Sequence, residues 1–437
     1  MQVKGIALMV TAIMFLGMIL PSCATKEVRE IEVTTLENGL TVVTKELHSS
    51  PVVAMTMAVR TGALYEDDAS NGASHFLEHL LFQKSYTREK PVFDYVEDIG
   101  GMCNAGTSYD FVVYYIEAPQ EKFDAALDII LDMFLNPSLD EEEFDKEKGV
   151  ILAEISAMES NPISALYSEF PSLLYEVHPY RRPVAGPPQT VEKMTLADLA
   201  TFFYTHYTAN RMTLALVGDF ETSKILPQVK QKCSALRQGE PQEVKFPEQR
   251  PIESPRGKIE TKGFPLAFIM IGWHGVKALD ADFYPLQVLG YMLSGGKSSR
   301  LDQQIIGSGL ASEIYLISEP SYEPGAICFL VALSPENIDK VKQIIFAEIA
   351  DIKVGNIIEE ELRRAKSLYK SNFQRADEKA VDTALHLGLF ATIADFDFYN
   401  NLLGNVDKVT AEEVQRVCQK YLGRDNYAVL IFTPEVR

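Results

Sequence analysis

A proline-rich segment interrupts the chain near its middle. Between Arg237 and Gly257 lie four prolines, among charged and polar residues with little apolar periodicity. Proline interrupts helices and central strands, so residues 237–257 are predicted to be a linker. A chain of 437 residues is also too long for one typical domain. We therefore expect an N-terminal domain of residues 30–236 and a C-terminal domain of residues 258–437.

The N-terminal half mixes strand patterns with helix patterns. The turn signal Asn38-Gly39 predicts a hairpin, and Val52–Val59 follows as a third strand. Helices are expected at Ser74–Gln83, Gln120–Leu135 and Asp140–Met158, and further strands at Asp110–Glu117 and Met212–Val217. Such an order indicates an α+β fold, in which each domain is a mainly antiparallel sheet with helices packed on one side.

The C-terminal half repeats this plan. A strand is expected at Leu266–Trp273, and helices at Phe283–Met292, Asp339–Ile352 and Glu359–Arg375. The acidic helix start Glu141–Phe144 aligns with Glu359–Leu362, which indicates a diverged duplication. In this alignment Glu154 falls opposite Asn372, and the second half has no His-x-x-Glu-His string. Only the first of two homologous domains is therefore expected to hold a metal.

The N-terminus has the pattern of an export signal. Lys4 is the only charge in residues 1–22, and a long apolar run follows it. The end of this segment resembles the lipobox of bacterial lipoproteins, which implies cleavage before Cys23 and lipid attachment to it. Residues 23–29 would then be an anchor and tether on the periplasmic side of a bacterial membrane, and Ala24 after the cysteine points to the outer membrane. An ordinary secretory signal is the alternative.

Net charge argues against a nucleic-acid partner, and cysteine spacing excludes one type of metal site. The chain has 61 acidic and 41 basic residues, a formal charge of -20, so its field repels phosphate backbones and no nucleic-acid partner is expected. The cysteines beyond Cys23 have no paired spacing: Cys103, Cys233, Cys328 and Cys418. A zinc site built on cysteines is therefore excluded, and any metal must be held by histidine and carboxylate.

His75, Glu78 and His79 lie in one predicted helix. Residues four apart share a helix face, so the two imidazoles can bind one ion while Glu78 points nearby. This string is the inverted motif of zinc peptidases. Zinc accepts two histidines and a carboxylate and lowers the pKa of a water in the fourth position, whose proton Glu78 could take. Two helical histidines with ordinary hydrogen-bond partners are the alternative.

The third metal ligand must come from another segment. The acidic helix after Asp140 carries Glu143, Glu147 and Glu154 on one face, with the last two separated by about two turns. A charged helix face is often merely solvated, so these residues alone do not select one of the three.

Three sequence blocks resemble the insulinase/pitrilysin family of zinc peptidases: Gly72–Phe82, Gly100–Thr107 and Glu147–Glu154. The blocks match that family in order and spacing, and the resemblance extends over nearly all of residues 30–435. It implies one Zn²⁺ per chain, a peptidase activity on short or unfolded peptides, and a chamber of four such domains. The present chain would form half of that clamshell chamber.

The resemblance also assigns roles to single residues. It implies that His75, His79 and Glu154 are the zinc ligands. It further implies that Glu78 is the general base on the zinc-bound water. Glu147 would orient a ligand by hydrogen bonding.

Asn104 and Ala105 would lie on the strand against which the substrate backbone pairs. Active single-chain members carry an Arg and a Tyr seven residues apart in the second half, whereas this chain has Ile305 and Ser312 there. Neither side chain can support an oxyanion as that pair does. Some bacterial members work as pairs, which implies a heterodimer with a related chain that supplies Arg and Tyr. The alternatives are a noncatalytic assembly or binding subunit and an exported zinc-binding protein.

Overall fold

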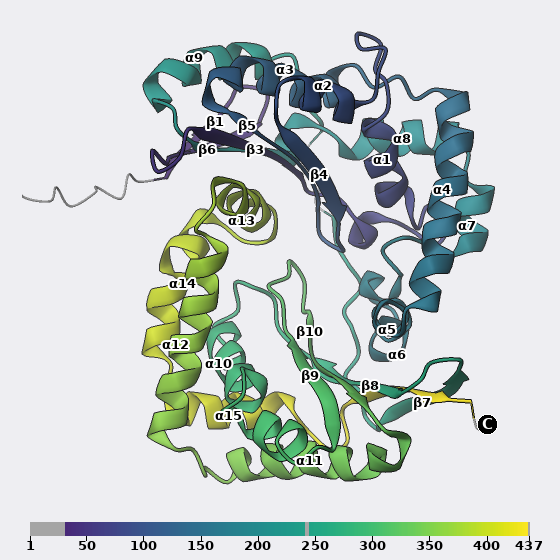
Figure 1. The fold of residues 1–437 in the computed structure, drawn as a ribbon, viewed down its shortest axis with the longest axis vertical. Coiled ribbons are helices and arrows are strands. Elements are labelled where there is room, and N and C mark those ends of the chain that lie inside the picture. The colour runs from purple at the N-terminus through teal and green to yellow at the C-terminus, as the bar shows by residue number, and fades with distance from the viewer. Residues whose placement is uncertain (1–30, 241–243, 436–437) are drawn as a thin grey trace, which may run out of the picture.

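The computed structural model describes residues 31–240 and 244–435 (Figure 1). The first sheet has the strand order β1-β2-β6-β3-β5-β4, and the second has the order β7-β11-β8-β10-β9. The first sheet comprises β1 Glu32–Thr35, β2 Thr41–Glu46, β3 Val52–Val59, β4 Met102–Thr107, β5 Val112–Pro119 and β6 Met212–Gly218. The second comprises β7 Arg256–Lys262, β8 Ala267–His274, β9 Ala311–Ile317, β10 Ala326–Leu333 and β11 Ala428–Pro434. The predicted α+β class with two similar domains is confirmed.

Helices cover both sheets. The first domain contains α1 Ala73–Leu81, α2 Val92–Asp98, α3 Phe123–Leu135, α4 Glu141–Ser160, α5 Pro162–Glu169, α6 Pro171–Leu174, α7 Pro188–Lys193, α8 Leu196–His206 and α9 Thr222–Cys233. The second contains α10 Phe283–Ser294, α11 Ile338–Lys353, α12 Glu359–Ala376, α13 Ala380–Ile393, α14 Phe396–Lys408 and α15 Ala411–Tyr421. The predicted signal peptide, residues 23–29 and Cys23 lie outside the described residues, so export and lipid attachment stay predictions.

The topology repeats between the two domains. Without β1, the first sheet has the order β2-β6-β3-β5-β4, which the second repeats as β7-β11-β8-β10-β9. The β2–β6 and β7–β11 pairs are parallel, and the other neighbouring strands pair antiparallel. Thr195 and Thr410 begin α8 and α15 with the same capping box. The duplication predicted from the sequence is therefore visible in the fold.

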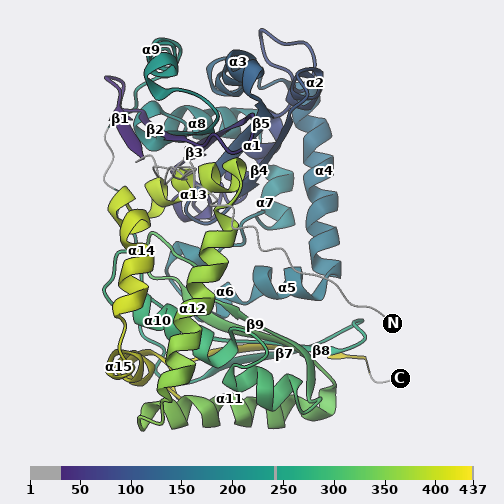
Figure 2. The same ribbon diagram turned by 60° about the vertical axis from the view of Figure 1, so that its left-hand side comes forward.

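Each domain also covers the sheet of the other. Strands β3 and β6 are buried along almost their whole length, so both faces of the first sheet need apolar cover. Helix α13 supplies it and lies against β3 and β6 (Figure 1 and Figure 2). Leu387 of α13 belongs to one hydrophobic core with Ala54 and Val217. Gly388 allows this close packing, because a Cβ there would lie 3.1 Å from a methyl of Thr56.

The second sheet receives its cover from helices α5 and α6 of the first domain. Leu166 and Phe170 share a core with Met270, Leu330 and Leu430 of that sheet. Figure 1 shows these two short helices between the sheets. The domains are interlocked through this exchange of helices, so their relative position is set by apolar burial and not only by the linker.

One strand differs from the sequence prediction. The linker is predicted to reach residue 257, whereas β7 begins at Arg256 and pairs in parallel with β11 from Ala428. Most of its residues are exposed or half-buried, since β7 is an edge strand. An edge strand with little apolar burial carries little of the alternating pattern that identifies strands from sequence.

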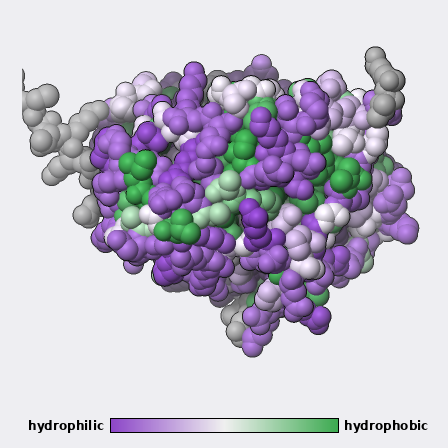
Figure 3. Space-filling model, turned by 90° about the horizontal axis from the view of Figure 1, so that it is seen from below, coloured by the Kyte–Doolittle hydropathy of each residue, from purple (hydrophilic) through white to green (hydrophobic). Residues whose placement is uncertain are grey.

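The outer face of the second domain is mainly hydrophilic. Seen from below, hydrophobic residues form small patches among hydrophilic ones (Figure 3). Within residues 31–240 and 244–435, every helix is too short or too polar to span a membrane. The four described cysteines are free thiols.

Candidate metal centre

The motif helix α1 begins at a tightly built turn. Gly72 has a φ of 101°, and a Cβ there would lie 2.8 Å from the carbonyl oxygen of Ala185. The buried carboxylate of Glu66 accepts the backbone N–H groups of Gly72 and Ser74, each at 2.8 Å. These contacts satisfy donors that a helix N-terminus leaves free, and they hold the first turn of α1 in one position.

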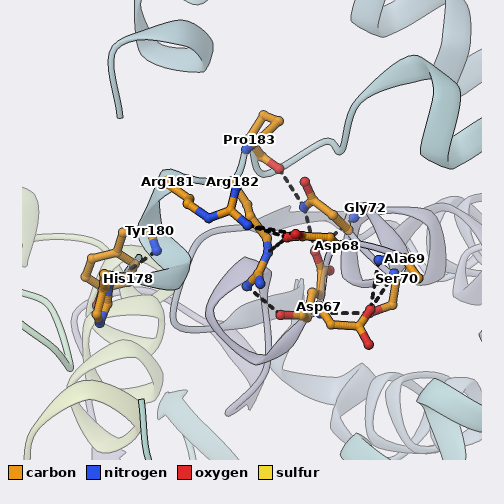
Figure 4. Close-up of polar contacts among 12 residues, drawn as sticks. Asp67, Asp68, Ala69, Ser70, Gly72, His178, Tyr180, Arg181, Arg182 and Pro183 are labelled. Carbon is orange, nitrogen blue, oxygen red and sulfur yellow. Dashed lines mark hydrogen bonds and ion pairs between the residues drawn. The ribbon is translucent and has the colours of Figure 1, made fainter. Parts of the chain in front are cut away.

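A second segment fixes the loop that precedes α1 (Figure 4). Asp68 accepts hydrogen bonds from Arg181 at 2.6 Å and from Arg182 at 2.9 Å. The amide of Asn71 donates to the carbonyl of Pro183 at 2.9 Å. The start of the motif helix is therefore anchored by residues more than a hundred positions away in the sequence.

His178 belongs to this scaffold. Its Nδ1 accepts the backbone N–H of Tyr180 at 3.2 Å, as Figure 4 shows, and burial lowers its pKa to about 4. The Tyr180 hydroxyl donates to the buried carboxylate of Asp110 at 2.5 Å. The His178 side chain thus takes part in packing and hydrogen bonding away from the motif helix.

Helix α4 packs against α1 and carries the acidic residues. Asp140 caps α4 by accepting the N–H groups of Glu142 and Glu143. The rings of Phe76 and Phe144 stack at a centroid distance of 5.0 Å, which fixes the two helices against each other. This packing turns the stripe of Glu147 and Glu154 toward the histidines.

His75, His79 and Glu154 converge on one point. Oε2 of Glu154 lies 3.3 Å from Nε2 of His79 and 3.7 Å from Nε2 of His75. The three ligand atoms all lie within 4.8 Å of one another. Tetrahedral zinc with nitrogen and oxygen ligands places neighbouring ligand atoms about 3.3 Å apart. Both the chemistry and the spacing of this donor set fit a zinc ion.

Glu147 supports this donor set from behind. Its Oε2 lies 3.2 Å from Nδ1 of His79, and its Oε1 accepts the side-chain amide of Gln83 at 3.0 Å. An imidazole that keeps its proton at Nδ1 presents the Nε2 lone pair to a metal. Glu147 is buried and therefore held in this orientation.

The protonation states of His75 and Glu154 suit metal binding, whereas the carboxylates around His79 favour its protonated form until a metal displaces the proton. Burial, helped by the neighbouring His79, lowers the pKa of His75 to about 4, so this imidazole is neutral at pH 7. Burial also acts to lower the pKa of His79, but the carboxylates of Glu154 and Glu147 outweigh it and raise the pKa. The hydrogen bond from His79 lowers the pKa of Glu154, which stays ionised. Neutral imidazoles and an ionised carboxylate are the forms that bind zinc.

Glu78 stands beside the cluster without belonging to it. Its Oε2 accepts a hydrogen bond from the Thr107 hydroxyl of β4 at 2.5 Å. Burial raises the pKa of Glu78, although this hydrogen bond opposes the shift. A carboxylate with a raised pKa next to a metal site is suited to accept a proton near neutral pH.

Asn104 and Ala105 lie on β4, which is the last strand of the first sheet. The backbone N–H of Ala105 donates to the side chain of Asn104 at 2.9 Å, and Asn104 is exposed. Among the described strands, β4 pairs only with β5, so its outer edge can receive an added strand. Cys103 on the same strand has its pKa raised to about 11 by burial, as expected for a packed thiol.

The remaining candidates lie elsewhere. Glu143 contacts Lys146 at 3.3 Å and is not part of the cluster. Ile305 is fully buried in the core of the second domain, and the Ser312 hydroxyl donates to the carbonyl of Ala332. Ile305 is therefore directed into the core, and the Ser312 hydroxyl is held by the neighbouring strand β10.

Two residues that contact the site, Gln83 and Thr107, were not predicted from the sequence. Gln83, which binds Glu147, continues the four-residue spacing of His75 and His79, so its position on that face could have been inferred. The contact of Thr107 with Glu78 could not be inferred from spacing, because β4 and α1 are brought together only by the tertiary structure.

Two family models match consecutive parts of the chain. Residues 41–188 match the model described as insulinase (peptidase family M16), and residues 193–369 match the model described as peptidase M16 inactive domain. Both domains of the chain match the insulinase family, M16. The second match agrees with the absence of a metal cluster among the described residues of the C-terminal domain.

Similar proteins match almost the whole chain. An uncharacterized zinc protease of Rickettsia felis is 27% identical over 409 residues, which cover 93% of this chain and 98% of that protein. A probable mitochondrial-processing peptidase subunit beta of Arabidopsis thaliana is 26% identical and covers 93% of this chain and 78% of that protein. The crystal structure of a protease from Helicobacter pylori has a TM-score of 0.87 at 23% identity, covers 93% of this chain and 100% of that one, and shows the shared fold. These matches support a zinc metallopeptidase at the level of the family.

Proposed function

We propose that this protein is a zinc-dependent endopeptidase that hydrolyses short or unfolded peptides. The observation that carries the proposal is the convergence of His75, His79 and Glu154, with Glu78 beside them on the same helix. The match to the M16 family supports the same reaction class.

His75, His79 and Glu154 would hold the zinc ion, which supplies Lewis acidity and lowers the pKa of a water. Glu78 accepts the proton of the attacking water and then passes it to the amine that leaves. Glu147 holds His79 in one tautomer and orientation. A peptide added along the open edge of β4 would present its backbone to these groups.

The contact between Thr107 and Glu78 leads to a first prediction. Thr107→Val replaces the hydroxyl by a methyl group of nearly the same size, so Glu78 loses the hydrogen bond that orients it. We expect kcat for peptide hydrolysis to fall by roughly ten- to hundredfold, because a charge-assisted hydrogen bond contributes about 1.5–3 kcal/mol. Steady-state kinetics with a quenched fluorescent peptide would measure this loss. Thr107→Ser keeps the hydroxyl and should retain most of the activity; equal losses in both variants would contradict the assignment.

We further propose that the active form includes a related partner chain. Ile305 and Ser312 leave the second domain without an Arg and Tyr pair, and the similar Arabidopsis protein is named as a subunit of a peptidase. We expect the purified zinc-loaded chain to hydrolyse peptides at least tenfold faster when mixed with an M16 chain that keeps Arg and Tyr. Rates that do not change on mixing, at concentrations where the chains co-elute, would refute the partner proposal and leave the metal site unaffected.

A further inference from the structure

A cavity of about 300 Å³ lies between the two domains. The loop Ser108–Phe111, which directly follows β4, forms one wall, and Phe170 and Leu174 of α5–α6 form another. Met270 and Cys328 of the second sheet lie opposite. Figure 1 shows α5 and α6 above this sheet and below the end of β4. The cavity is therefore complete only where both domains meet.

Two polar side chains at the cavity, Asp110 and Tyr175, have partners within the protein. The carboxylate of Asp110 accepts the hydroxyl of Tyr180 at 2.5 Å and the backbone N–H of Tyr322 at 3.1 Å. The Tyr175 hydroxyl donates to the carbonyl of Pro324 at 3.1 Å. Burial raises the pKa of Asp110 to about 6, as expected where water is scarce. The remaining lining is mainly apolar or aromatic, so the cavity favours an apolar occupant over an ion.

The volume suits one large side chain. An apolar cavity of about 150 Å³ is known to hold a benzene molecule. At about 300 Å³, this cavity has room for an aromatic ring or a branched aliphatic side chain with its Cβ. Tyr167, which lines the cavity, is 46% exposed, so this part of the lining is open to solvent.

The wall of the cavity follows directly in the chain on a residue that contacts Glu78. Thr107, which donates to Glu78, is the residue immediately before Ser108 of the cavity wall. Consecutive Cα atoms are about 3.8 Å apart, so the wall begins one residue beyond the contact with Glu78. A peptide that pairs with β4 would run past this wall within a few residues of the bond that is cut.

We propose that this interdomain cavity is a specificity pocket that binds one large apolar side chain, aromatic or branched aliphatic, of the bound peptide. The proposal rests on the peptide binding that the proposed function requires. It places the side-chain preference in a pocket made by both domains, since the exchange of α5, α6 and α13 holds its walls together.

Binding to a zinc-loaded Glu78→Gln full-length protein tests this proposal without hydrolysis. Labelled peptides of constant sequence would carry Ala, Leu or Phe at one position at a time, and fluorescence anisotropy would measure each Kd. We expect one position at which Leu or Phe binds about tenfold or more tightly than Ala, the range that apolar pockets provide. Ala326→Phe, which fills the cavity from β10, should bring this ratio close to one. Tyr167→Ala changes an exposed lining residue and should reduce the ratio without disturbing the core.

The ratio of two peptides separates specificity from damage to the fold. Ala197→Phe adds the same ring to an exposed position of α8 and should keep the full ratio. Peptides that show no preference at any position would overturn the proposal, as would an unchanged ratio in both cavity variants. Wild-type protein that binds with this preference but does not hydrolyse peptides would refute the proposed function and leave the pocket standing. Hydrolysis without any side-chain preference would support the proposed function and refute the pocket.

Discussion

Glu78→Gln is expected to keep one zinc per chain and to lower peptide hydrolysis by roughly 10²–10⁴-fold, the usual contribution of a general base. Glutamine has nearly the shape of glutamate, and its amide oxygen can still accept the hydroxyl of Thr107. It cannot accept a proton from water. Glu78 lies outside the cluster of metal donors, so the zinc content should not change. Atomic absorption and a quenched fluorescent peptide would measure the two quantities on the same preparation.

Glu159→Gln is the matched control for this experiment. Glu159 is exposed on α4, so its loss should change neither zinc content nor rate. A Glu78→Gln protein with activity within threefold of the wild type would show that another group takes the proton. Loss of zinc in this variant would instead make Glu78 a ligand. Wild-type protein that binds zinc without turnover would favour the noncatalytic alternatives.

Glu154→Gln is expected to remove most of the bound zinc. Among the residues that the structure describes, its carboxylate is the only one near both Nε2 atoms, at 3.3 and 3.7 Å, and a neutral amide is a poor zinc ligand. The zinc Kd should rise by more than the ten- to hundredfold that follows loss of a residue orienting a ligand. Hydrolysis should fall with the zinc content. A chelator competition would give the Kd, and the melting temperature with and without EDTA would report the stabilisation that zinc provides.

Substitutions of two other glutamates of α4, Glu147 and Glu143, give reference values for this experiment. Glu147→Gln should weaken zinc binding by about ten- to hundredfold, because a neutral amide replaces the charge beside Nδ1 of His79 and leaves the ligands in place. Glu143→Gln should have no effect on zinc, since Glu143 contacts lysines. Zinc retained by Glu154→Gln but lost from Glu143→Gln would refute the ligand set.

Much of the fold follows from local patterns in the chain. The turn Asn38-Gly39 and the strands around it predict the hairpin of β1 and β2, whose pairing is confirmed. The helix starts at Glu141 and Glu359 are confirmed as the first residues of α4 and α12. These features were predictable because capping, turn chemistry and apolar periodicity act between residues only a few positions apart.

Other parts of the fold could not be predicted in this way. Helix α13 covers the first sheet because Gly388 fits closely against β3. Helices α5 and α6 cover the second sheet, where Phe170 packs into its core. Apolar patterning shows that a helix has a face to bury, but it does not show which of two similar sheets covers that face.

The candidate metal centre likewise has features that local spacing predicts and features that depend on tertiary contacts. The spacing of His75 and His79 by itself determined a two-histidine clamp with Glu78 nearby, because one helical turn brings these side chains together. Helix periodicity alone left Glu143, Glu147 and Glu154 open, and the family resemblance implied Glu154. The tertiary structure places Glu154 and not Glu143 at the histidines, since the stacking of Phe76 on Phe144 sets the rotation of α4. Thr107 and the interdomain cavity likewise depend on contacts between distant segments. Helical geometry acts between neighbours in the chain, whereas these contacts exist only once the sheets and helices have packed.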